Sequence, residues 1–366
     1  HSIFSTTSSS TESVKNSGAT EPTTKELTGK PIDNCEPTEP DYSKPSPSIA
    51  QNLPLLKKLS KNRRKQLEKR QTRNQLAENL FDEFYTAQYD TRWPPLLAAL
   101  RNPHRYCAMT NKYACQKSIE SYLPSDAQQV PFLDIPCYIS NDKFTPPTAD
   151  GSGITIVYHL DASSVLATKA LDVQPDDNIL DMCAGPGGKT LSILQRLSHS
   201  GYLTSNEPSV SRRVRLQRVI NNYIPPSMLH RVTVISSVST YPPLFDKVIA
   251  DVPCSNERHL LQNETEFVRW NDRHSKKLLS TQYTILWDSI KMVKIGGIVV
   301  YSTCSINKCE NDGVIEKFLD KSRMNIEIVR REYEVGESTD YGWIVLPDKS
   351  DGWGPLYFCV LKKLNK

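Results

Sequence analysis

The feature that most constrains the fold is a repeated order of short apolar runs and helical segments, which begins after Ile154. The apolar runs are predicted strands at 178–183, 201–206, 232–235, 246–251 and 297–302. Helical segments from about 189, at 211–222 and at 272–294 lie between them. This alternation is typical of a parallel sheet covered by helices. We therefore expect a doubly wound α/β domain, whose ligands bind at the carboxyl ends of its strands.

Composition divides the chain into four predicted parts. Residues 1–53 are rich in Ser, Thr and Pro and are expected to be disordered, because they carry too few apolar side chains to offset the entropy lost on folding. Residues 54–75 form a basic segment, 76–150 a small helical N-terminal lobe, and 151–366 the α/β domain. The piece from Ile326 to Lys363 is expected to add antiparallel strands at one edge of the sheet.

The basic segment contains KKLSKNRRKQLEKRQTR, with nine basic residues against the single acid Glu68. Such a run attracts phosphate backbones without reading sequence, and a solvated helix explains it equally well. The nine cysteines include no CxxC pair, so neither a disulfide framework nor a metal site is expected. No apolar run approaches the roughly 18 residues of a membrane span, and we expect a soluble protein without membrane contact.

Two consecutive strand ends carry features of a nucleoside site. NILDMCAGPGGKT, from Asn178 to Thr190, is a strand that opens into a glycine-rich turn and then a helix. Glycines allow a ligand to approach the backbone closely, although a plain strand-to-helix connection would look similar. Glu207 ends the next strand, about 20 residues on, where a doubly wound nucleoside site carries its ribose-binding carboxylate.

Two later strand ends each present a cysteine. DVPCS places Asp251 and Cys254 after one strand, and YSTCS places Cys304 after the next. Asp251 follows the apolar run VIA, which predicts a partly desolvated carboxylate. A cysteine beside a pocket is a candidate nucleophile, whereas an inert buried thiol is the commoner outcome. From the residues alone, the two readings stay open.

Taken together, DMCAGPGGKT, SNEPS, DVPCS and YSTCS resemble the Sun/Nop/RsmB-type RNA cytosine-C5 methyltransferases, over Ile154 to about Lys363. The resemblance implies a class I S-adenosylmethionine-dependent methyltransferase fold. YHLDASSVLATKAL and IVLPDKSDGWGPLYFCVLKK are most similar to the mitochondrial branch of that family, which modifies small-subunit rRNA or a tRNA.

The resemblance also implies residue roles. Cys304 would attack C6 of the cytosine, Cys254 would help to resolve the covalent adduct, and Asp251 would hold N3 and N4 of the base, with Lys189 assisting. The cofactor would contact Cys183, Ala184, Gly185, Pro186, Gly187, Gly188, Lys189, Glu207, Arg212, Val238 and Asp251. Val238 and Ser239 stand where the family usually has Asp-Gly near the adenine. Either Ser237 or Ser239 substitutes for the missing acceptor, or the cofactor binds more weakly.

The expected partner is structured RNA, most of all mitochondrial small-subunit rRNA, with the protein as a monomeric catalytic subunit in the mitochondrial matrix. An accessory protein that aids RNA targeting is part of this expectation. The alternatives are a mitochondrial tRNA cytosine-C5 methyltransferase and a non-catalytic RNA-binding ribosome assembly factor. A DNA cytosine methyltransferase, with Cys254 as its nucleophile, is disfavoured by the TCS motif that contains Cys304.

Overall fold

The computed structural model describes residues 61–365 apart from 239–243, 269 and 271. The predicted disordered tail and the beginning of the predicted basic segment lie outside the described residues. Helices occur at α2 (Lys61–Tyr89), η2 (Asp90–Arg92), α3 (Trp93–Arg101), α4 (Gln116–Tyr122), α5 (Ala162–Ala170), α6 (Gly188–Leu194), α7 (Val210–Tyr223), η3 (Pro226–Arg231), α8 (Glu257–Gln262), α9 (Glu264–Phe267), α10 (Asp272–Met292) and α11 (Asp312–Lys321). Strands occur at β1 (Cys107–Thr110), β2 (Gln128–Gln129), β3 (Cys137–Ile139), β4 (Val157–Leu160), β5 (Asn178–Asp181), β6 (Tyr202–Asn206), β7 (Val232–Ile235), β8 (Phe245–Asp251), β9 (Val293–Thr303), β10 (Ile326–Ile328), β11 (Glu337–Ser338), β12 (Trp343–Val345) and β13 (Leu356–Lys363).

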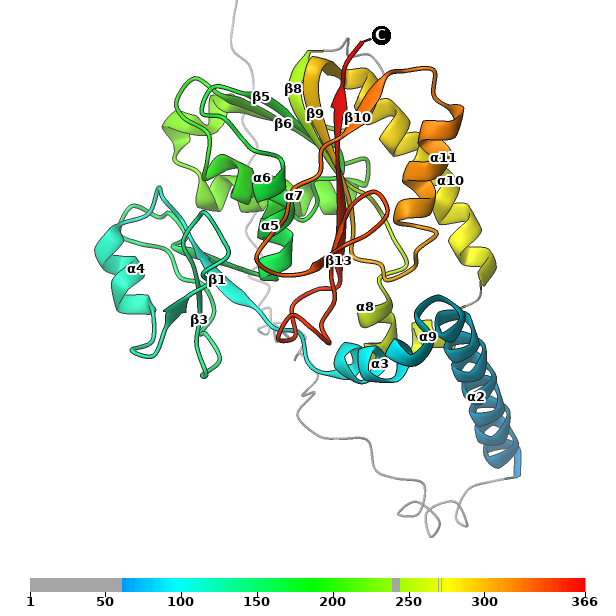
Figure 1. Cartoon of the computed structure of the whole chain (residues 1–366). Helices are drawn as coiled ribbons and strands as arrows, with labels where there is room; N and C mark the ends of the chain where they lie inside the picture. Colours follow the sequence, from blue (N-terminus) through cyan, green and yellow to red (C-terminus); the bar gives the residue numbers. More distant parts are fainter. Residues whose placement is uncertain (1–60, 239–243, 269, 271, 366) are drawn as a thin grey trace, which may run out of the picture. The chain divides into compact units, whose positions relative to one another are not determined.

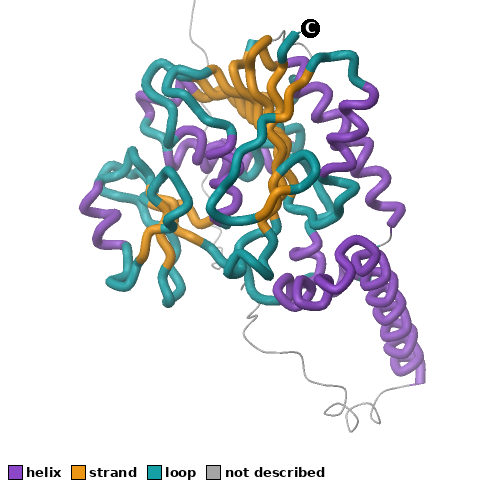
Figure 2. The backbone as a smooth tube through the Cα atoms, viewed as in Figure 1, coloured by secondary structure: helices purple, strands orange, loops and turns teal. Residues whose placement is uncertain are grey.

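The central sheet confirms the doubly wound α/β prediction. Within the described residues its strand order is β11-β12-β13-β9-β8-β5-β6-β7, and β10 also pairs with β13. Strands β5 to β9 pair in parallel and match the five predicted strands closely, while β10 to β13 add the expected antiparallel edge. Figures 1 and 2 show the strands side by side with helices on either face.

Alternate side chains of the central strands enter two different apolar cores. Ile179, Ile249 and Val300 pack on the face covered by α5, α6 and α7, in a core that includes Leu191 and Leu216. Their sequence neighbours Leu180, Val248, Ala250, Val299 and Tyr301 pack on the opposite face, where α10 and α11 contribute Leu286, Ile290 and Phe318. Strands buried on both faces read as continuous apolar runs, which is why the sequence predicts them well.

The N-terminal part combines helices with a small sheet. Helices α2 and α3 confirm the expected helical region, and two prolines occupy the first turn of α3. The structure adds an antiparallel sheet of order β2-β3-β1-β4, which the sequence analysis does not anticipate. Its strands span only two to four residues, too few to show an alternating pattern.

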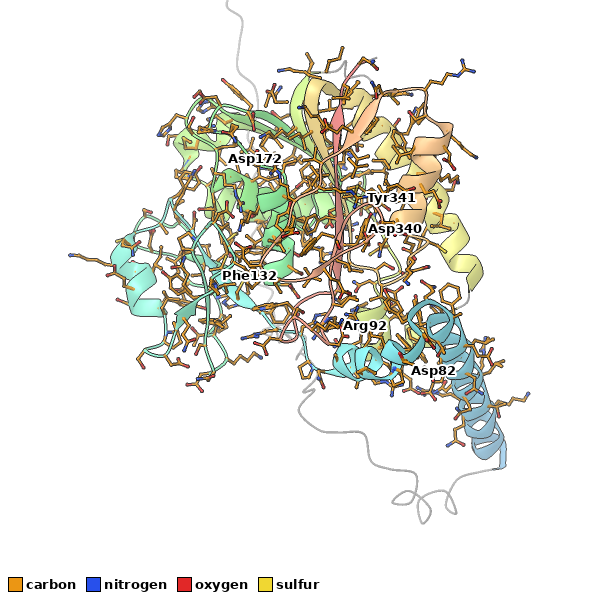
Figure 3. The ribbon with its side chains drawn as sticks, in the orientation of Figure 1. Asp82, Arg92, Phe132, Asp172, Asp340 and Tyr341 are labelled. Atoms are coloured by element: carbon orange, nitrogen blue, oxygen red, sulfur yellow. The ribbon has the colours of Figure 1, made fainter. Side chains whose placement is uncertain are left out.

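Arg92 ties the helical N-terminal region to the C-terminal segment (Figure 3). It lies in η2 and forms ion pairs with Glu337 and with Asp348, whose Oδ2 is 2.7 Å from Arg92 Nε. Asp82 on α2 accepts a hydrogen bond from the Trp93 indole at 3.1 Å. Polar contacts therefore fix the junction between α2 and α3. None of the helices among the described residues combines the length and the apolar character that crossing a membrane requires.

Candidate active site

Three neighbouring parallel strands bring the sequence-predicted motifs to one edge of the sheet. β8 lies between β5 and β9, and Asp251 at the end of β8 is in register with Ser302 near the end of β9. The glycine-rich turn follows β5, the DVPCS motif ends β8, and the TCS motif ends β9. The carboxyl ends of parallel strands are the usual ligand-binding edge of such a sheet.

A cavity of about 250 Å³ opens beside the glycine-rich turn. Its lining includes the predicted residues Cys183, Ala184, Gly185, Pro186, Gly188, Lys189 and Asp251. Tyr158, His159, Leu160 and Ser164 complete the wall, and the sequence analysis misses them. They come from β4 and α5, and nothing in their local sequence reveals that the small sheet packs against the turn.

The turn itself depends on two of its glycines. A Cβ on Gly185 would lie 2.5 Å from Glu207 Oε2 and 3.2 Å from Arg212 Cβ, so a side chain has no room there. Gly187 has φ +124° and precedes α6, a backbone conformation that L side chains rarely adopt. Gly187 faces Val219 of α7 and does not line the cavity.

Glu207 and Arg212 lie behind the turn. Glu207 is only 3% exposed, its Oε1 accepts from the Ser209 amide at 2.9 Å, and its Oε2 is 3.4 Å from Arg212 Nε. Arg212 also donates to the Gly185 carbonyl at 2.6 Å. These contacts support the turn, and neither residue lines the cavity. Their predicted roles in cofactor binding stay predictions.

Val238 follows β7 and lies in the apolar core with Leu180 and Val248. It is buried, with 9% of its surface exposed. Its side chain supplies no hydrogen-bond acceptor, and Ser239 falls outside the described residues. The proposal that a serine substitutes for the family's aspartate therefore stays open.

Lys189 and Asp251 form an ion pair in the cavity wall. Lys189 Nζ is 2.8 Å from Asp251 Oδ2, and Ser302 Oγ donates to Asp251 Oδ1 at 2.9 Å. Burial opposes the charge of Lys189, but the adjacent Asp251 carboxylate outweighs it, and the pKa of Lys189 is raised. The pair presents an ammonium donor and a carboxylate acceptor side by side.

Asp181, at the end of β5, is a second carboxyl group that the sequence analysis does not single out. Burial is the main cause that raises its pKa to about 7, against the hydrogen bond from Thr190 Oγ1 at 2.7 Å. Its Oδ1 is buried and has no hydrogen-bond partner among the described residues. Its position before the glycine-rich turn is the sequence signal that could have identified it.

The two predicted cysteines are in contact. The Sγ atoms of Cys254 and Cys304 lie 2.9 Å apart, and both thiols are free. The hydrogen bond to Cys304, followed by burial, raises the pKa of Cys254 well above its ordinary value. The charge of Lys189 interacts with Cys304, which places a cation near this thiol. Cysteines next to a cation are the reactive ones in proteins.

Comparisons with known proteins agree with this geometry. The family model described as 16S rRNA methyltransferase RsmB/F matches residues 168–359. The mitochondrial tRNA (cytosine(34)-C(5))-methyltransferase of Danio rerio is 31% identical over 318 residues, which cover 78% of this chain and 86% of that protein. The 5-cytosine rRNA methyltransferase NSUN4 of Mus musculus is 29% identical over 347 residues, covering 80% and 90%.

Solved structures share the fold. A methyltransferase homolog protein from Pyrococcus horikoshii superimposes with a TM-score of 0.64 at 22% identity, covering 78% of this chain and 95% of that one. NSun6 from the same organism, solved with SFG, has a TM-score of 0.61 at 16% identity and covers 78% and 98%. The family match and the Danio rerio relative confirm the resemblance drawn from the motifs: the chain belongs to the RsmB/F family of RNA cytosine-C5 methyltransferases.

Proposed function

We propose that this chain uses S-adenosylmethionine to form 5-methylcytosine in mitochondrial small-subunit rRNA. The observation that carries the proposal is the contact between Cys254 and Cys304 beside the ion pair of Lys189 and Asp251. Two thiols supply a nucleophile and a proton donor for a pyrimidine ring. A carboxylate beside an ammonium group can hold the polar edge of a cytosine.

Asp251 is the residue that we assign to the N3 and N4 edge of the base. Ser302 and Lys189 donate to opposite oxygens of its carboxylate and fix its orientation. The target base must reach this strand edge, so it leaves its helix or comes from a loop. Lys189 then stays within reach of the same base.

Cys304 is assigned the nucleophilic step. Its thiolate adds to C6 of the cytosine, and the electron pair of the C5–C6 bond moves toward C5. S-adenosylmethionine, when bound, supplies the methyl group that C5 accepts. C5 then loses its proton to solvent water, the bond between C6 and the Cys304 sulfur breaks with its electron pair on sulfur, and Cys254 donates a proton to the departing sulfur. The 2.9 Å separation of the two sulfur atoms supports this last transfer.

The residues around the cavity fit S-adenosylmethionine. The glycine-rich turn would hold its methionine part, because Gly185 and Gly188 leave the cavity wall without side chains. The buried, unpartnered Oδ1 of Asp181 is an acceptor next to that turn. Glu207 is the remaining candidate for the ribose hydroxyls. The ring of Tyr158 lies next to Gly188. It would close the cavity on the side opposite the glycine-rich turn.

The relatives support RNA as the substrate, since their names include a tRNA and an rRNA enzyme, and the Danio rerio relative, whose name includes "mitochondrial", supports mitochondria as the compartment. The Danio rerio relative favours a second candidate, methylation of a mitochondrial tRNA. We further propose a monomeric catalytic subunit in the matrix, which an accessory protein directs to its RNA. A non-catalytic assembly factor is motivated by Val238, and a titration without any affinity for S-adenosylmethionine would support that alternative.

Bisulfite sequencing of mitochondrial and cytosolic RNA, with and without the gene, tests the proposal. Loss of one methylated cytosine from mitochondrial small-subunit rRNA is the expected result. Loss from a mitochondrial tRNA would establish the second candidate. If no cytosine changes in any RNA, while the protein is expressed and folded, the proposed activity is wrong.

A further inference from the structure

The two cysteine turns touch at a second point behind the thiols. Ser255 follows Cys254, Ser305 follows Cys304, and the two serine hydroxyls lie 2.8 Å apart. The pair of thiols is therefore followed, one residue on in each turn, by a pair of hydroxyl groups that are also in contact. Two turns that belong to different strands are joined by side chains as well as by the sheet.

A buried carboxylate joins these turns. Glu257, the first residue of α8, is fully buried, and its Oε1 accepts hydrogen bonds from Ser255 Oγ and, at 3.1 Å, from Ser305 Oγ. Its Oε2 accepts from the Ile306 amide at 2.9 Å. Hydrogen bonds to a charged acceptor are roughly twice as strong as neutral ones. The carboxylate thus holds the residues that follow both cysteines.

Helix α2 reaches the same carboxylate. The Tyr85 hydroxyl donates to Glu257 Oε1 at 2.6 Å, across 172 residues of sequence. The Tyr85 ring is fully buried and stacks on Trp93 with a centroid distance of 5.2 Å. The hydroxyl is therefore held in place by the packing of α2 against α3. An N-terminal helix is in this way part of the support of the cysteine turns.

A second buried carboxylate lies on the Cys254 side. Glu310 Oε2 accepts from the Ser255 amide at 3.0 Å and from Gln282 Nε2 at 2.8 Å. The negative charges of Glu257 and Glu310 add to the causes that raise the pKa of Cys254. Lys189 lies on the other side, near Cys304. The negative charges of the two carboxylates therefore lie on the Cys254 side of the pair, where they favour a proton on Cys254, and the cation lies on the Cys304 side.

We propose that Glu257 is a positioning residue that holds the two cysteine turns in contact, and that Tyr85 makes helix α2 part of this support. The inference rests on the proposed function for its effect on turnover. Glu257 is fully buried and does not line the cavity, so it acts through the cysteines and not on the substrate.

The first experiment measures turnover in the full chain. Glu257→Gln keeps the size of the side chain but replaces a charged acceptor by one oxygen and a donor, and Tyr85→Phe removes one hydroxyl. We expect kcat to fall about ten-fold in Glu257→Gln and several-fold in Tyr85→Phe, with KM for RNA and cofactor unchanged. Combined with Glu257→Gln, Tyr85→Phe should add little, because it acts through the same carboxylate.

The control is Glu83→Gln, a change of the same kind at an exposed position of α2, which should leave kcat as it is. The pH profile separates a positioning role from general destabilisation. Removing the negative charge at residue 257 removes one cause of the raised pKa of Cys254. The alkaline limb of the kcat profile, which reports loss of the Cys254 proton, should therefore move to lower pH. A rise in KM alone, or an unchanged kcat in folded Glu257→Gln, would overturn the inference.

The second experiment needs no RNA. Phenylarsine oxide binds two thiols that lie close together, and a Cys254→Ala variant gives the background from the other cysteines. We expect Glu257→Gln to weaken the Cys254-dependent binding about ten-fold and Tyr85→Phe to weaken it less. Equal binding by the wild type and both variants refutes the positioning role. An inactive wild type that still shows this difference would refute the proposed function and not the inference.

Discussion

At the scale of single residues, surroundings distinguish two chemically identical thiols. Cys254 and Cys304 share one hydrogen bond, yet buried carboxylates lie near the first and Lys189 near the second. The same logic applies to the two acids of the site. Asp251 is paired with Lys189, whereas Asp181 is buried with one oxygen unpartnered. Environment, more than residue type, sets what each group can do.

Cys304→Ala should abolish the covalent adduct with RNA that contains 5-fluorocytidine, since no sulfur then attacks C6. Cys254→Ala should still form the adduct but release it slowly. Denaturing gel electrophoresis of the protein–RNA mixture measures both. Cys115→Ala, which changes an exposed cysteine outside the site, serves as the control. Adduct formation lost in Cys254→Ala and kept in Cys304→Ala would reverse the two roles.

Asp181→Asn should change how stability depends on pH. The folded pKa of about 7 lies above the ordinary value of 3.8, so the folded state binds the proton more tightly than the unfolded state. The stability that this proton contributes is fully present below about pH 3.8 and is lost as pH rises through about 7. In thermal unfolding, the Tm of the variant should therefore rise relative to the Tm of the wild type between pH 5 and 8. Parallel curves for both proteins would contradict the expected pKa.

At the scale of elements, the glycine-rich turn both lines the cavity and packs closely against its neighbours. Gly185 leaves room for Glu207, Gly187 bends the chain against α7, and Arg212 binds the turn from behind. These contacts keep the backbone of the turn close to Glu207 and α7. Substitutions in the turn are thus expected to affect the cavity through the contacts of the turn with Glu207, Arg212 and α7.

Gly185→Ala should weaken S-adenosylmethionine binding at least ten-fold, because its Cβ would collide with the Glu207 carboxylate. Titration calorimetry of the folded variant measures the affinity. Gly151→Ala is the matched control, since a Cβ at that glycine meets no atom within 4 Å. An unchanged dissociation constant in Gly185→Ala would argue against this turn as the cofactor site.

Sequence patterns predict some elements of this chain much better than others. Strand β7 is predicted at its observed bounds, and β8 within one residue, because short apolar runs begin after Arg231 and end at Asp251. β2 has two residues and β4 has four, so neither shows a periodic signal. Cys254 and Cys304 were identifiable from their motifs. Tyr158 and Glu257 were not, since only tertiary packing brings them to the site.

At the scale of the whole molecule, Arg258 connects three separate segments. It is fully buried and donates to the carbonyls of Gly352 and Gly354 and to that of Pro103, the last at 2.9 Å. The residue after Glu257 thus joins α8 to the link between α3 and β1 and to the loop before β13. Burial lowers the pKa of Arg258, because its charged guanidinium is removed from water.

Arg258→Met should lower the free energy of unfolding by about 2 to 4 kcal/mol, because it removes the donor from three carbonyls, of which that of Gly354 is buried. Urea unfolding followed by circular dichroism measures the loss. Arg101→Met, at an exposed position of α3, should change stability by less than about 0.5 kcal/mol. Similar midpoints for the two variants would show that water or other donors replace the guanidinium.

Asp251 and Ser302 pair in adjacent strands. Because of this pairing, the distance between the two thiols does not depend on the length of chain between them. Neighbouring strands lie about 4.8 Å apart whatever the connection between them. The strand pairing therefore sets the distance between the two strand ends that carry the cysteines, and the length of the segment that contains α9 and α10 does not. Insertions between α9 and α10 should leave the spacing of the two sulfur atoms unchanged.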